Sequence, residues 1–341
     1  MKKILVTGGA GYIGSHTVLE LLKADYDVLV IDNLSNSKIE ALHRVEKLAG
    51  KKPEFKKLDL LDQEGLNNLF ASNEIEAVIH FAGLKAVGES VAKPLLYYEN
   101  NITGTVNLCK AMKKAGVFNI VFSSSATVYG DPDEVPIPET ASLTAVNPYG
   151  RTKLTIEYIL KELHEADNNW NVALLRYFNP VGADKSGEIG EDPSGIPNNL
   201  MPYITQVAVE KLPYLRVFGN DYPTHDGSGV RDYIHVTDLS LGHLKALKKL
   251  HENPGVVTYN LGTGIGYSVL DLVQAFEDAT GISIPYKITE RRPGDAASCY
   301  ADPSKAQKEL NWTAKKDLKD MCRDSWNWQS KNPEGYSDGI S

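Results

Sequence analysis

A tyrosine and a lysine four residues apart form the pair in this sequence whose chemistry points most directly to catalysis. Tyr149 and Lys153 begin a segment, 149–163, whose apolar residues recur with helical spacing. Residues four apart share a helix face, so we expect both side chains to point the same way. Lowering the pKa of a tyrosine from about 10 to about 7 takes about 4 kcal/mol, and a cation about 4 Å away supplies that much at an effective dielectric of about 20. The pair therefore predicts a tyrosinate base, although an exposed helix can carry the same spacing by chance.

Hydroxyl side chains end a predicted strand, Ile120–Ser123. Ser123, Ser124 and Ser125 follow one another where the strand stops. In a doubly wound fold, ligands bind at the carboxyl ends of the strands. A run of serines is also typical of a plain turn. Combined with the tyrosine–lysine pair, it favours a chemical site at this edge of a sheet.

A glycine-rich turn follows the first predicted strand, Ile4–Thr7. Gly8, Gly11 and Gly14 are spaced three apart where a predicted helix begins. Glycines there permit a tight turn and let backbone amides approach a pyrophosphate, whose charge the helix dipole favours. Asp32 ends the second strand, where a carboxylate can bind a ribose hydroxyl and would repel a 2′-phosphate. An ordinary strand–helix loop can carry the same glycines, but together with Asp32 they predict a site for NAD rather than NADP.

The elements that must position these residues alternate along the first half of the chain. Buried strands bounded by Gly, Asp, Asn or Ser alternate with helical windows, which predicts parallel βαβ units with helices on both faces of the sheet. The expected strands are Ile4–Thr7, Val28–Ile31, Phe55–Leu58, Ala77–Phe81, Ile120–Ser123 and Val172–Leu175, and the expected helices are Ser15–Lys23, Ile39–Leu48, Gly65–Ala71, Leu95–Lys114 and Tyr149–Leu163.

The pattern changes after Asn179, and the stretch 184–199 is rich in the loop formers Gly, Pro, Asp and Asn. The expected later elements are helices over 239–250, from Val269 with Ser268 as its cap, over 304–310 and over 318–329, and a strand over 256–261. A chain of 341 residues exceeds one core. We therefore expect an α/β protein with a Rossmann-type doubly wound parallel sheet and a second, smaller α/β substrate-binding lobe. The first domain, 1–180, would bind NAD and carry the catalytic residues. The lobe would occupy most of 181–341, with parts of 233–262 returning to pack on the first domain.

Composition and charge exclude several classes of function. The net charge of −8 argues against a surface for nucleic acid, although a local basic pocket can still bind a small phosphate ligand. No stretch approaches the roughly 20 apolar residues of a membrane-spanning helix. Cys109, Cys299 and Cys322 are odd in number and far apart, which predicts neither a disulfide framework nor a metal site. A reducing, cytoplasmic environment fits best.

The turn Gly8-x-x-Gly11-x-x-Gly14 differs from the Gly-x-Gly-x-x-Gly of typical dehydrogenases and resembles the extended short-chain dehydrogenase/reductase family. The pair Asp59-Leu60 after the third strand and the triplet Phe81-Ala82-Gly83 after the fourth resemble that family too. The resemblance implies that Ser125, Tyr149 and Lys153 are a catalytic triad. Ser125 would hydrogen-bond the reacting sugar hydroxyl and Tyr149 would move its proton. Lys153 would bind the nicotinamide ribose and, helped by the positive nicotinamide ring of NAD, would lower the pKa of Tyr149. The residues implied to bind NAD are Gly8, Gly11, Tyr12, Ile13, Gly14, Asp32, Asn33, Asn36, Ser37, Asp59, Leu60, Phe81, Ala82, Gly83, Lys85, Asn100, Ser123, Tyr149, Lys153, Tyr177 and Phe178.

Four longer runs, 81–90, 176–183, 195–202 and 229–236, look like the UDP-galactose 4-epimerase family, and the resemblance extends essentially from end to end. It implies a UDP-sugar substrate. Asn179, Asn199, Leu200 and Phe218 would line the UDP pocket, Arg231 and Arg292 would bind the pyrophosphate, Asp295 would meet the uridine ribose, and Lys85, Ser125, Tyr149 and Cys299 would complete the substrate contacts. A forked guanidinium suits phosphate oxygens, although either arginine alone could be a surface ion-pair partner.

The resemblance implies a 4-epimerisation of UDP-glucose and UDP-galactose through a transient 4-keto sugar, with NAD bound tightly enough to copurify. Members restricted to plain hexoses tend to carry tyrosine at the position of Cys299. The smaller side chain predicts that N-acetylhexosamine substrates also fit, unless the cysteine is only a packing residue. The family also implies a homodimer, with the helices around Leu95–Lys114 and Tyr149–Leu163 as its interface.

Three other functions fit the sequence less well. Nucleotide-sugar 4,6-dehydratases typically carry Thr-Asp-Glu where this chain has Ser125-Ala126-Thr127, which disfavours elimination of water. An enzyme acting on UDP-glucuronate is disfavoured by the full-length resemblance. An NAD-binding sensor without catalytic activity would commonly lack the tyrosine or the lysine, and Tyr149 and Lys153 are both present.

Overall fold

The computed structural model describes residues 2–192, 197, 199–292 and 295–336. The chain forms two compact units. The first comprises Met1–Gly130, Leu143–Arg176 and Ser240–Tyr259, and the second comprises Asp131–Ser142, Tyr177–Leu239 and Asn260–Ser341. The short segment 131–142 belongs to the second unit, which no sequence pattern indicated. None of the described helices combines the length and the apolar composition of a membrane-spanning segment.

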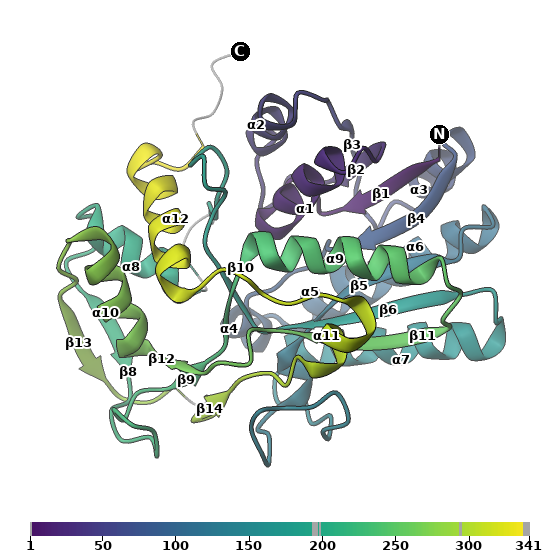
Figure 1. Ribbon diagram of the computed structural model, residues 1–341. Coiled ribbons are helices and arrows are strands. Elements are labelled where there is room, and N and C mark those ends of the chain that lie inside the picture. The colour runs from purple at the N-terminus through teal and green to yellow at the C-terminus, as the bar shows by residue number, and fades with distance from the viewer. Residues whose placement is uncertain (1, 193–196, 198, 293–294, 337–341) are drawn as a thin grey trace. The chain divides into compact units, whose positions relative to one another are not determined.

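A seven-stranded sheet organises the first unit (Figure 1), in the order β11-β6-β5-β4-β1-β2-β3. The strands are β1 (Lys3–Thr7), β2 (Val28–Asp32), β3 (Glu54–Lys57), β4 (Ile75–His80), β5 (Asn119–Ser125), β6 (Asn171–Tyr177) and β11 (Val256–Leu261). β1 pairs in parallel with β2 and β4, β2 with β3, and β4 with β5. This is the strand order of doubly wound dinucleotide-binding folds, so the predicted fold class is confirmed. The six strands predicted for the first half lie within two residues of the observed ones at both ends.

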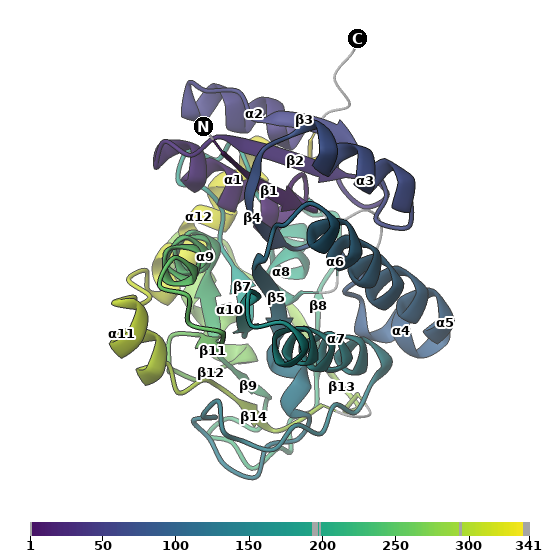
Figure 2. The ribbon, with the colours of Figure 1, turned by 90° about the vertical axis from the view of Figure 1, so that its right-hand side faces the viewer.

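Helices cover both faces of this sheet. They are α1 (Tyr12–Lys23), α2 (Glu40–Ala49), α3 (Gln63–Ser72), α6 (Gly104–Lys114), α7 (Pro148–Ala166) and α9 (Val236–Leu250). Figure 2 shows α1 and α9 on one side of the strands and α3, α6 and α7 on the other. Leu66, Leu108 and Leu160, one from each of these last three helices, are fully buried and share one hydrophobic cluster with Phe122 of β5. Apolar stripes at helical spacing thus attach the helices to the sheet.

The pairing register brings the carboxyl ends of the strands to one edge of the sheet. Thr7 pairs with His80, His80 with Phe122, and Asp32 with Lys57. The glycine turn, Asp32 and the serine run therefore all follow strand ends at the same edge, where doubly wound folds bind their ligands.

The predicted helix Leu95–Lys114 is wrong as a single α-helix. Instead α5 (Pro94–Tyr97) leads into a π-helical turn, η1 (Tyr98–Thr103), before α6 begins, and a short helix that was not predicted, α4 (Val87–Ala92), precedes them. Within the π-turn, Asn101 is buried and its amide bonds both the N–H and the C=O of Leu84. Apolar periodicity carries no signal for a widened turn that is held by a polar side chain.

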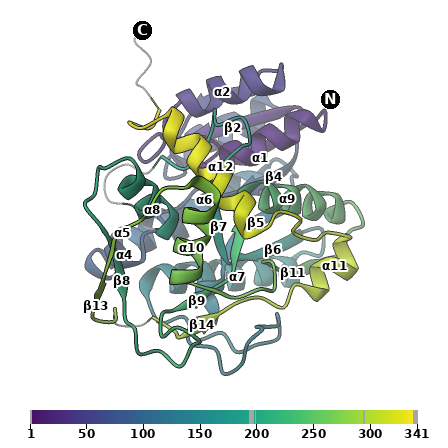
Figure 3. The same ribbon diagram turned by 60° about the vertical axis from the view of Figure 1, so that its left-hand side comes forward.

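The second unit has its own core and smaller sheets. Its elements are β7 (Asn179–Val181), α8 (Leu200–Ala208), β8 (Leu215–Phe218), β9 (Val230–Arg231), β10 (Tyr233–His235), β12 (Tyr267–Ser268), α10 (Val269–Thr280), β13 (Tyr286–Thr289), β14 (Ser298–Cys299), α11 (Ser304–Leu310) and α12 (Leu318–Lys331). Figure 3 shows α12 beside α8 and α10. Met201, Phe276 and Met321, one from each of these helices, share its core. The predicted cap of α10 is confirmed, because Ser268 and Asp271 form a capping box.

Candidate active site

In the glycine turn between β1 and α1, neighbouring backbone atoms lie closer than a residue with a Cβ atom would allow. Gly8 has a left-handed φ of 69°, and a Cβ there would lie 2.7 Å from the Ala82 amide nitrogen. A Cβ on Gly14 would lie 2.2 Å from the Gly8 carbonyl oxygen. α1 begins after Gly11 with Tyr12 and Ile13 and has no side-chain cap. The amides of its first turn are therefore suited to bind a pyrophosphate, as the dipole of the helix also favours.

Asp32 is fixed in place beside this turn. Its Oδ2 accepts the Ala10 amide at 3.1 Å, and its Oδ1 accepts the Ser37 hydroxyl at 2.8 Å. Asn33 donates to Asp59 at 2.8 Å and so joins the loops that follow β2 and β3. A carboxylate oxygen can accept two hydrogen bonds, so Oδ2 has the capacity to bind a ribose hydroxyl as well. These residues fit the dinucleotide that the sequence predicts.

The loop after β4 is held against β1 by a side chain. The Thr7 hydroxyl accepts the Ala82 amide at 3.2 Å, and the Phe81 ring lies 4.7 Å from the His243 ring between centroids. The remaining residues predicted to bind NAD are placed as follows: Asn36, Gly83 and Lys85 are exposed, Leu60 is buried, Asn100 is half-buried in η1, and Tyr177 and Phe178 are buried in the second unit.

The serine, tyrosine and lysine of the predicted triad come together in the first unit. Ser125 ends β5, and its hydroxyl hydrogen-bonds Tyr149 in the first turn of α7. Lys153, one turn further along, donates from Nζ to the Ser123 carbonyl at 2.6 Å and to the Ser123 hydroxyl at 3.3 Å. Tyr149 and Lys153 thus share the face of α7 that meets the serine run.

Burial dominates the electrostatics of this triad. Burial raises the pKa of Tyr149, and the hydrogen bond from Ser125 offsets only part of that rise. Burial also lowers the pKa of Lys153 to about 7. The Lys153 ammonium lies 6.0 Å from the centroid of the Tyr149 ring. The predicted fall in the pKa of Tyr149 depends on the Lys153 ammonium together with the positive nicotinamide ring of NAD, and in the residues of the chain alone desolvation raises this pKa.

Sequence reasoning missed a buried amide that supports Tyr149. Asn101 Nδ2 donates to the Thr152 hydroxyl at 3.0 Å, and this hydroxyl donates to the Tyr149 carbonyl at 2.7 Å. The other end of the amide, Asn101 Oδ1, accepts the Leu84 amide at 2.8 Å. The first turn of α7 is thereby tied to the loop after β4. The available signal was a second asparagine beside Asn100 inside an apolar helical pattern.

The second unit brings three of the residues predicted to bind UDP into contact. The Arg292 guanidinium carbon lies 4.7 Å from the centroid of the Phe218 ring, and Arg292 Nε donates to Asp295 at 3.0 Å. The Arg292 side chain is 57% exposed. An exposed arginine that stacks on an aromatic ring can turn its remaining donors to phosphate oxygens. Residues 293 and 294 of the predicted run lie outside the described residues.

Arg231 and Cys299 lie opposite each other on parallel strands β9 and β14. Arg231 Nη1 donates to the Val230 carbonyl at 2.8 Å. Burial raises the pKa of the Cys299 thiol to about 11, so the thiol is neutral at physiological pH. Cys299 therefore has the properties of a small lining residue rather than of a nucleophile.

A buried carboxylate that sequence reasoning did not assign fixes this pair of strands. Asp232 accepts the amides of Thr263, Gly264 and Ala301 at 2.8, 3.0 and 3.1 Å. Its own amide donates to the Cys299 carbonyl at 3.1 Å. Asp232, which follows β9, thus links this strand to the loop after β11 and to the residues after β14. Its position next to Arg231 in the run 229–236 was the only signal.

The other three residues predicted to bind UDP lie at the start of β7 and at the start of α8 in the second unit. The backbone N–H of Asn179, at the start of β7, donates to the backbone carbonyl of Asp232 at 2.9 Å. Asn199 precedes α8 and donates from Nδ2 to Glu191 at 2.8 Å rather than to either arginine. Leu200 begins α8 and packs on the core of the unit.

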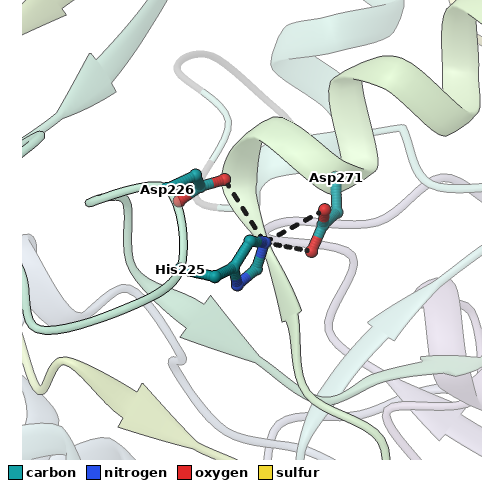
Figure 4. Close-up of side chains that lie close together, drawn as sticks. All are labelled: His225, Asp226 and Asp271. Carbon is teal, nitrogen blue, oxygen red and sulfur yellow. Dashed lines mark hydrogen bonds and ion pairs between the residues drawn. The ribbon is translucent and has the colours of Figure 1, made fainter.

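A His–Asp–Asp cluster in the second unit has the residue types of a metal site. His225 Nε2 lies 3.2 Å from Asp271 Oδ2 and 3.7 Å from Asp226 Oδ2 (Figure 4). Both carboxylates already serve the fold, because Ser268 donates its amide to Asp271 and its hydroxyl to Asp226. The contacts of this cluster therefore serve to join the loop that carries His225 to the start of α10, and we assign no metal to it.

Fold and site together define the class of extended short-chain dehydrogenases/reductases. The family model described as GDP-mannose 4,6 dehydratase matches residues 5–325. The UDP-glucose 4-epimerase of Bacillus subtilis (strain 168) is 65% identical over 333 residues, which cover 98% of this chain and 98% of that relative.

Solved structures of the same kind are similar along the whole chain. The UDP-glucose-4-epimerase from Stenotrophomonas maltophila, with bound NAD and formylated UDP-arabinopyranose, matches with a TM-score of 0.96 at 51% identity, over 98% of this chain and 99% of that chain. The UDP-glucose 4-epimerase from Bifidobacterium longum, in complex with NAD+ and UDP, matches with a TM-score of 0.95 at 55% identity, over 98% of this chain and 100% of that chain. This chain belongs to the UDP-glucose 4-epimerase family.

Proposed function

We propose that this chain is an NAD-dependent 4-epimerase that interconverts UDP-glucose and UDP-galactose through a 4-keto sugar. The observation that carries the proposal is the triad Ser125–Tyr149–Lys153, set at the same sheet edge as the glycine turn and Asp32. The family to which the chain belongs supports the same reaction. The triad is suited to move a proton at a sugar hydroxyl, and the turn is suited to hold the pyrophosphate of a dinucleotide.

In this reaction Tyr149 takes the proton from the C4 hydroxyl and later returns one to C4 oxygen. Ser125, which hydrogen-bonds Tyr149, orients that hydroxyl. NAD, when bound through the glycine turn and Asp32, supplies the hydride acceptor and donor for C4 and a positive ring that favours ionisation of Tyr149. Lys153 adds its charge near Tyr149 and is anchored by the Ser123 carbonyl. Tyr149 and Lys153 therefore divide the tasks of proton transfer and charge stabilisation.

In the second unit, we assign binding of the UDP pyrophosphate to Arg231 and Arg292, and of the uridine ribose to Asp295. Phe218, which stacks on Arg292, would line the uridine pocket together with Asn179, Asn199 and Leu200. Forked guanidinium groups can bind two phosphate oxygens at once, which suits an otherwise acidic protein. An exposed ion pair such as Arg292–Asp295 can open to accept a ligand without exposing a buried charge.

The test is incubation of the purified protein with UDP-galactose and no added cofactor, with the products resolved by chromatography. Formation of UDP-glucose is expected, together with release of NAD on denaturation, because the same cofactor must remain through both half-reactions. Tyr149→Phe should retain the nucleotide and lose the conversion. If the wild-type protein converts neither UDP-galactose nor UDP-glucose, even after addition of NAD, the proposal is wrong.

A dehydratase reaction is disfavoured by the residues that follow Ser125. Elimination of water needs an acid next to the reacting sugar, and Ala126 and Thr127 stand where dehydratases typically carry Asp and Glu. The Thr127 hydroxyl instead donates to the Ser125 hydroxyl at 2.9 Å. A product that has lost water would show that this assignment is wrong.

We propose in addition that the enzyme accepts UDP-N-acetylglucosamine and UDP-N-acetylgalactosamine. Cys299 is a small side chain opposite Arg231, and a tyrosine there would occupy more space next to the residues assigned to the pyrophosphate. Cys299→Tyr should therefore abolish conversion of the N-acetyl sugars and retain conversion of UDP-galactose. Cys299→Ser is the matched control, and it should convert both. Equal activity of the tyrosine variant on both sugars would exclude this role of Cys299.

We further propose a homodimer formed through the helices next to α7. Val91 of α4, Leu95 and Leu96 of α5, and Tyr158 of α7 are 64%, 81%, 43% and 49% exposed, and α4 and α5 both contact α7. Such a group of apolar side chains is typical of an interface. Leu95→Glu should lower the mass measured by light scattering to that of one chain, whereas Leu241→Glu, on α9, should not. The three free cysteines are consistent with a reducing compartment, which we propose to be the cytoplasm.

A further inference from the structure

The three serines that end β5 each contact one residue of α7. The contacts are Ser125 with Tyr149, Ser123 with Lys153, and Ser124 with Glu157, whose Oε1 accepts the Ser124 hydroxyl at 2.5 Å. The three α7 residues are spaced four apart and so lie along one face of the helix. Two of these contacts belong to the proposed triad. The third contact, at Glu157, has no assigned part in the proposed reaction.

Glu157 is held from its other side by an arginine on the neighbouring strand. Arg176 of β6 donates Nε to Oε1 at 2.9 Å and Nη2 to Oε2 at 2.7 Å, which is a bidentate pair. Arg176 Nη1 donates to the Tyr129 hydroxyl at 3.0 Å. Tyr129 ends the 3₁₀ turn η2 (Ala126–Tyr129) that directly follows β5. Glu157 therefore holds the end of β5 through Ser124, and Arg176 holds the turn that follows β5 through Tyr129.

This network is almost completely removed from water. The side chains of Arg176 and Glu157 are 2% and 0% exposed, and Ser124 and Tyr129 are 1% exposed each. Replacing such a buried ion pair by apolar residues of similar volume is often neutral or stabilising for a fold. Stability alone therefore gives no reason for charges at this place. A bidentate pair does, however, fix the relative position of the elements that carry it within a narrow range.

We propose that Glu157 and Arg176 are positioning residues for Tyr149, which act by fixing the end of β5 against α7. Ser124 is the link, because a shift of its neighbour Ser125 changes the hydrogen bond to Tyr149. The proposal rests on the proposed function in that Tyr149 is taken as the base. Among the described residues, Ser125 of β5, Lys153 of α7 and Tyr97 of α5 face Tyr149, and Lys153 in turn interacts with His80 of β4.

Two variants test this. Ser124→Ala removes only the link and leaves Glu157 paired with Arg176. A second variant, Ser124→Ala/Tyr129→Phe/Glu157→Leu/Arg176→Met, replaces all four side chains by apolar groups, so that each hydrogen bond named above loses both of its partners. Lys161→Met is the matched control, since Lys161 approaches Glu157 from the solvent side at 3.9 Å and touches no serine of β5 in the contacts described.

The expected result is a fall in kcat with KM for UDP-galactose unchanged, because misplacement of a catalytic group by about 1 Å costs up to about 100-fold. We expect about ten-fold for Ser124→Ala and about 100-fold for the apolar variant, both with a folded far-ultraviolet spectrum. The acid limb of the kcat pH profile should move to higher pH in both. Lys161→Met should match the wild-type protein.

A second readout does not require activity. The phenolate absorbance of each protein is titrated beside that of its Tyr149→Phe counterpart, and the difference is the titration of Tyr149. An upward shift of this titration in the two network variants is expected. Wild-type kcat and wild-type Tyr149 titration in Ser124→Ala and in the apolar variant would overturn the proposal, as would an equal loss of activity in Lys161→Met. If the apolar variant does not fold, Ser124→Ala decides. A wild-type protein without epimerase activity would overturn the proposed function, and the Tyr149 titration would still decide the positioning role.

Discussion

Two arginine–carboxylate pairs, one in each unit, have similar closest distances and opposite surroundings. In the first unit, Arg176 and Glu157 are 2.7 Å apart and their side chains are 2% and 0% exposed. In the second unit, Arg292 and Asp295 are 3.0 Å apart and their side chains are 57% and 27% exposed. Distance alone would place the two pairs in the same category. Solvent exposure assigns them different physical roles.

A buried pair cannot exchange partners, because either charge left alone in an apolar interior costs several kcal/mol. An exposed pair contributes only about 0–1 kcal/mol, so a ligand phosphate can replace the carboxylate at little cost. Burial acts to lower the pKa of Arg176, but the hydrogen bonds and charge of Glu157 outweigh it and raise that pKa. The first pair is thus suited to hold elements in place, and the second is suited to open for a substrate.

The largest expected effect follows from breaking the buried pair. Arg176→Ala leaves the Glu157 carboxylate buried without its main partner, and should lower the free energy of unfolding by about 3–5 kcal/mol. Arg292→Ala, which breaks the exposed pair, should lower it by about 1 kcal/mol or less. Urea denaturation followed by circular dichroism at pH 7 measures both. Equal losses in the two variants would show that exposure does not separate the pairs.

Lys153 provides a second buried charge, and its expected effect depends on pH. Burial lowers its pKa from 10.5 to about 7 in the folded protein, so between these values the unfolded chain binds more protons than the folded one. Stability should therefore rise with pH in this window, by about 2 kcal/mol between pH 7 and 9. The measurement is the free energy of unfolding of the nucleotide-free protein at both values. Lys153→Met should lose this part of the rise, whereas Lys161→Met should keep it. A lysine variant with the same pH dependence as the wild-type protein would contradict the assignment.

The parts of this fold that sequence patterns predicted are those that depend on local order. The glycine turn, Asp32 and the pair Tyr149/Lys153 are each set by spacing within one element or at one junction. Sheet strands appear as short apolar runs, and the capping box at Ser268 appears as a cap three residues before an acid. Such features could be predicted because every residue involved lies within a few positions of the others.

The features that could not be predicted join segments that are distant in the sequence. Glu157 and Arg176 lie on a helix and a strand, and neither residue shows in its own segment that the other is its partner. Asn101 widens a helical turn through contacts with Leu84 and Thr152. The spacing of Tyr149 and Lys153 indicates a neighbouring charge but gives no signal for desolvation, which depends on every group that covers the ring and raises the pKa of Tyr149 in the residues of the chain alone.

The smallest expected effect concerns the exposed pair and tests whether Arg292 binds substrate. Loss of a charge-assisted hydrogen bond to phosphate should raise KM for UDP-galactose about ten-fold in Arg292→Ala, with little change in kcat. Its neighbour provides a matched control, because Arg291 is also exposed, pairs with Asp221 at 2.7 Å and lies 4.1 Å from the centroid of the Tyr222 ring. Arg291→Ala removes an ion pair and a ring contact of the same kind at a position not assigned to UDP, so it should leave KM unchanged. A ten-fold rise in both variants would mean that KM responds to the general charge of this loop, and a rise in neither would remove Arg292 from the proposed pyrophosphate site.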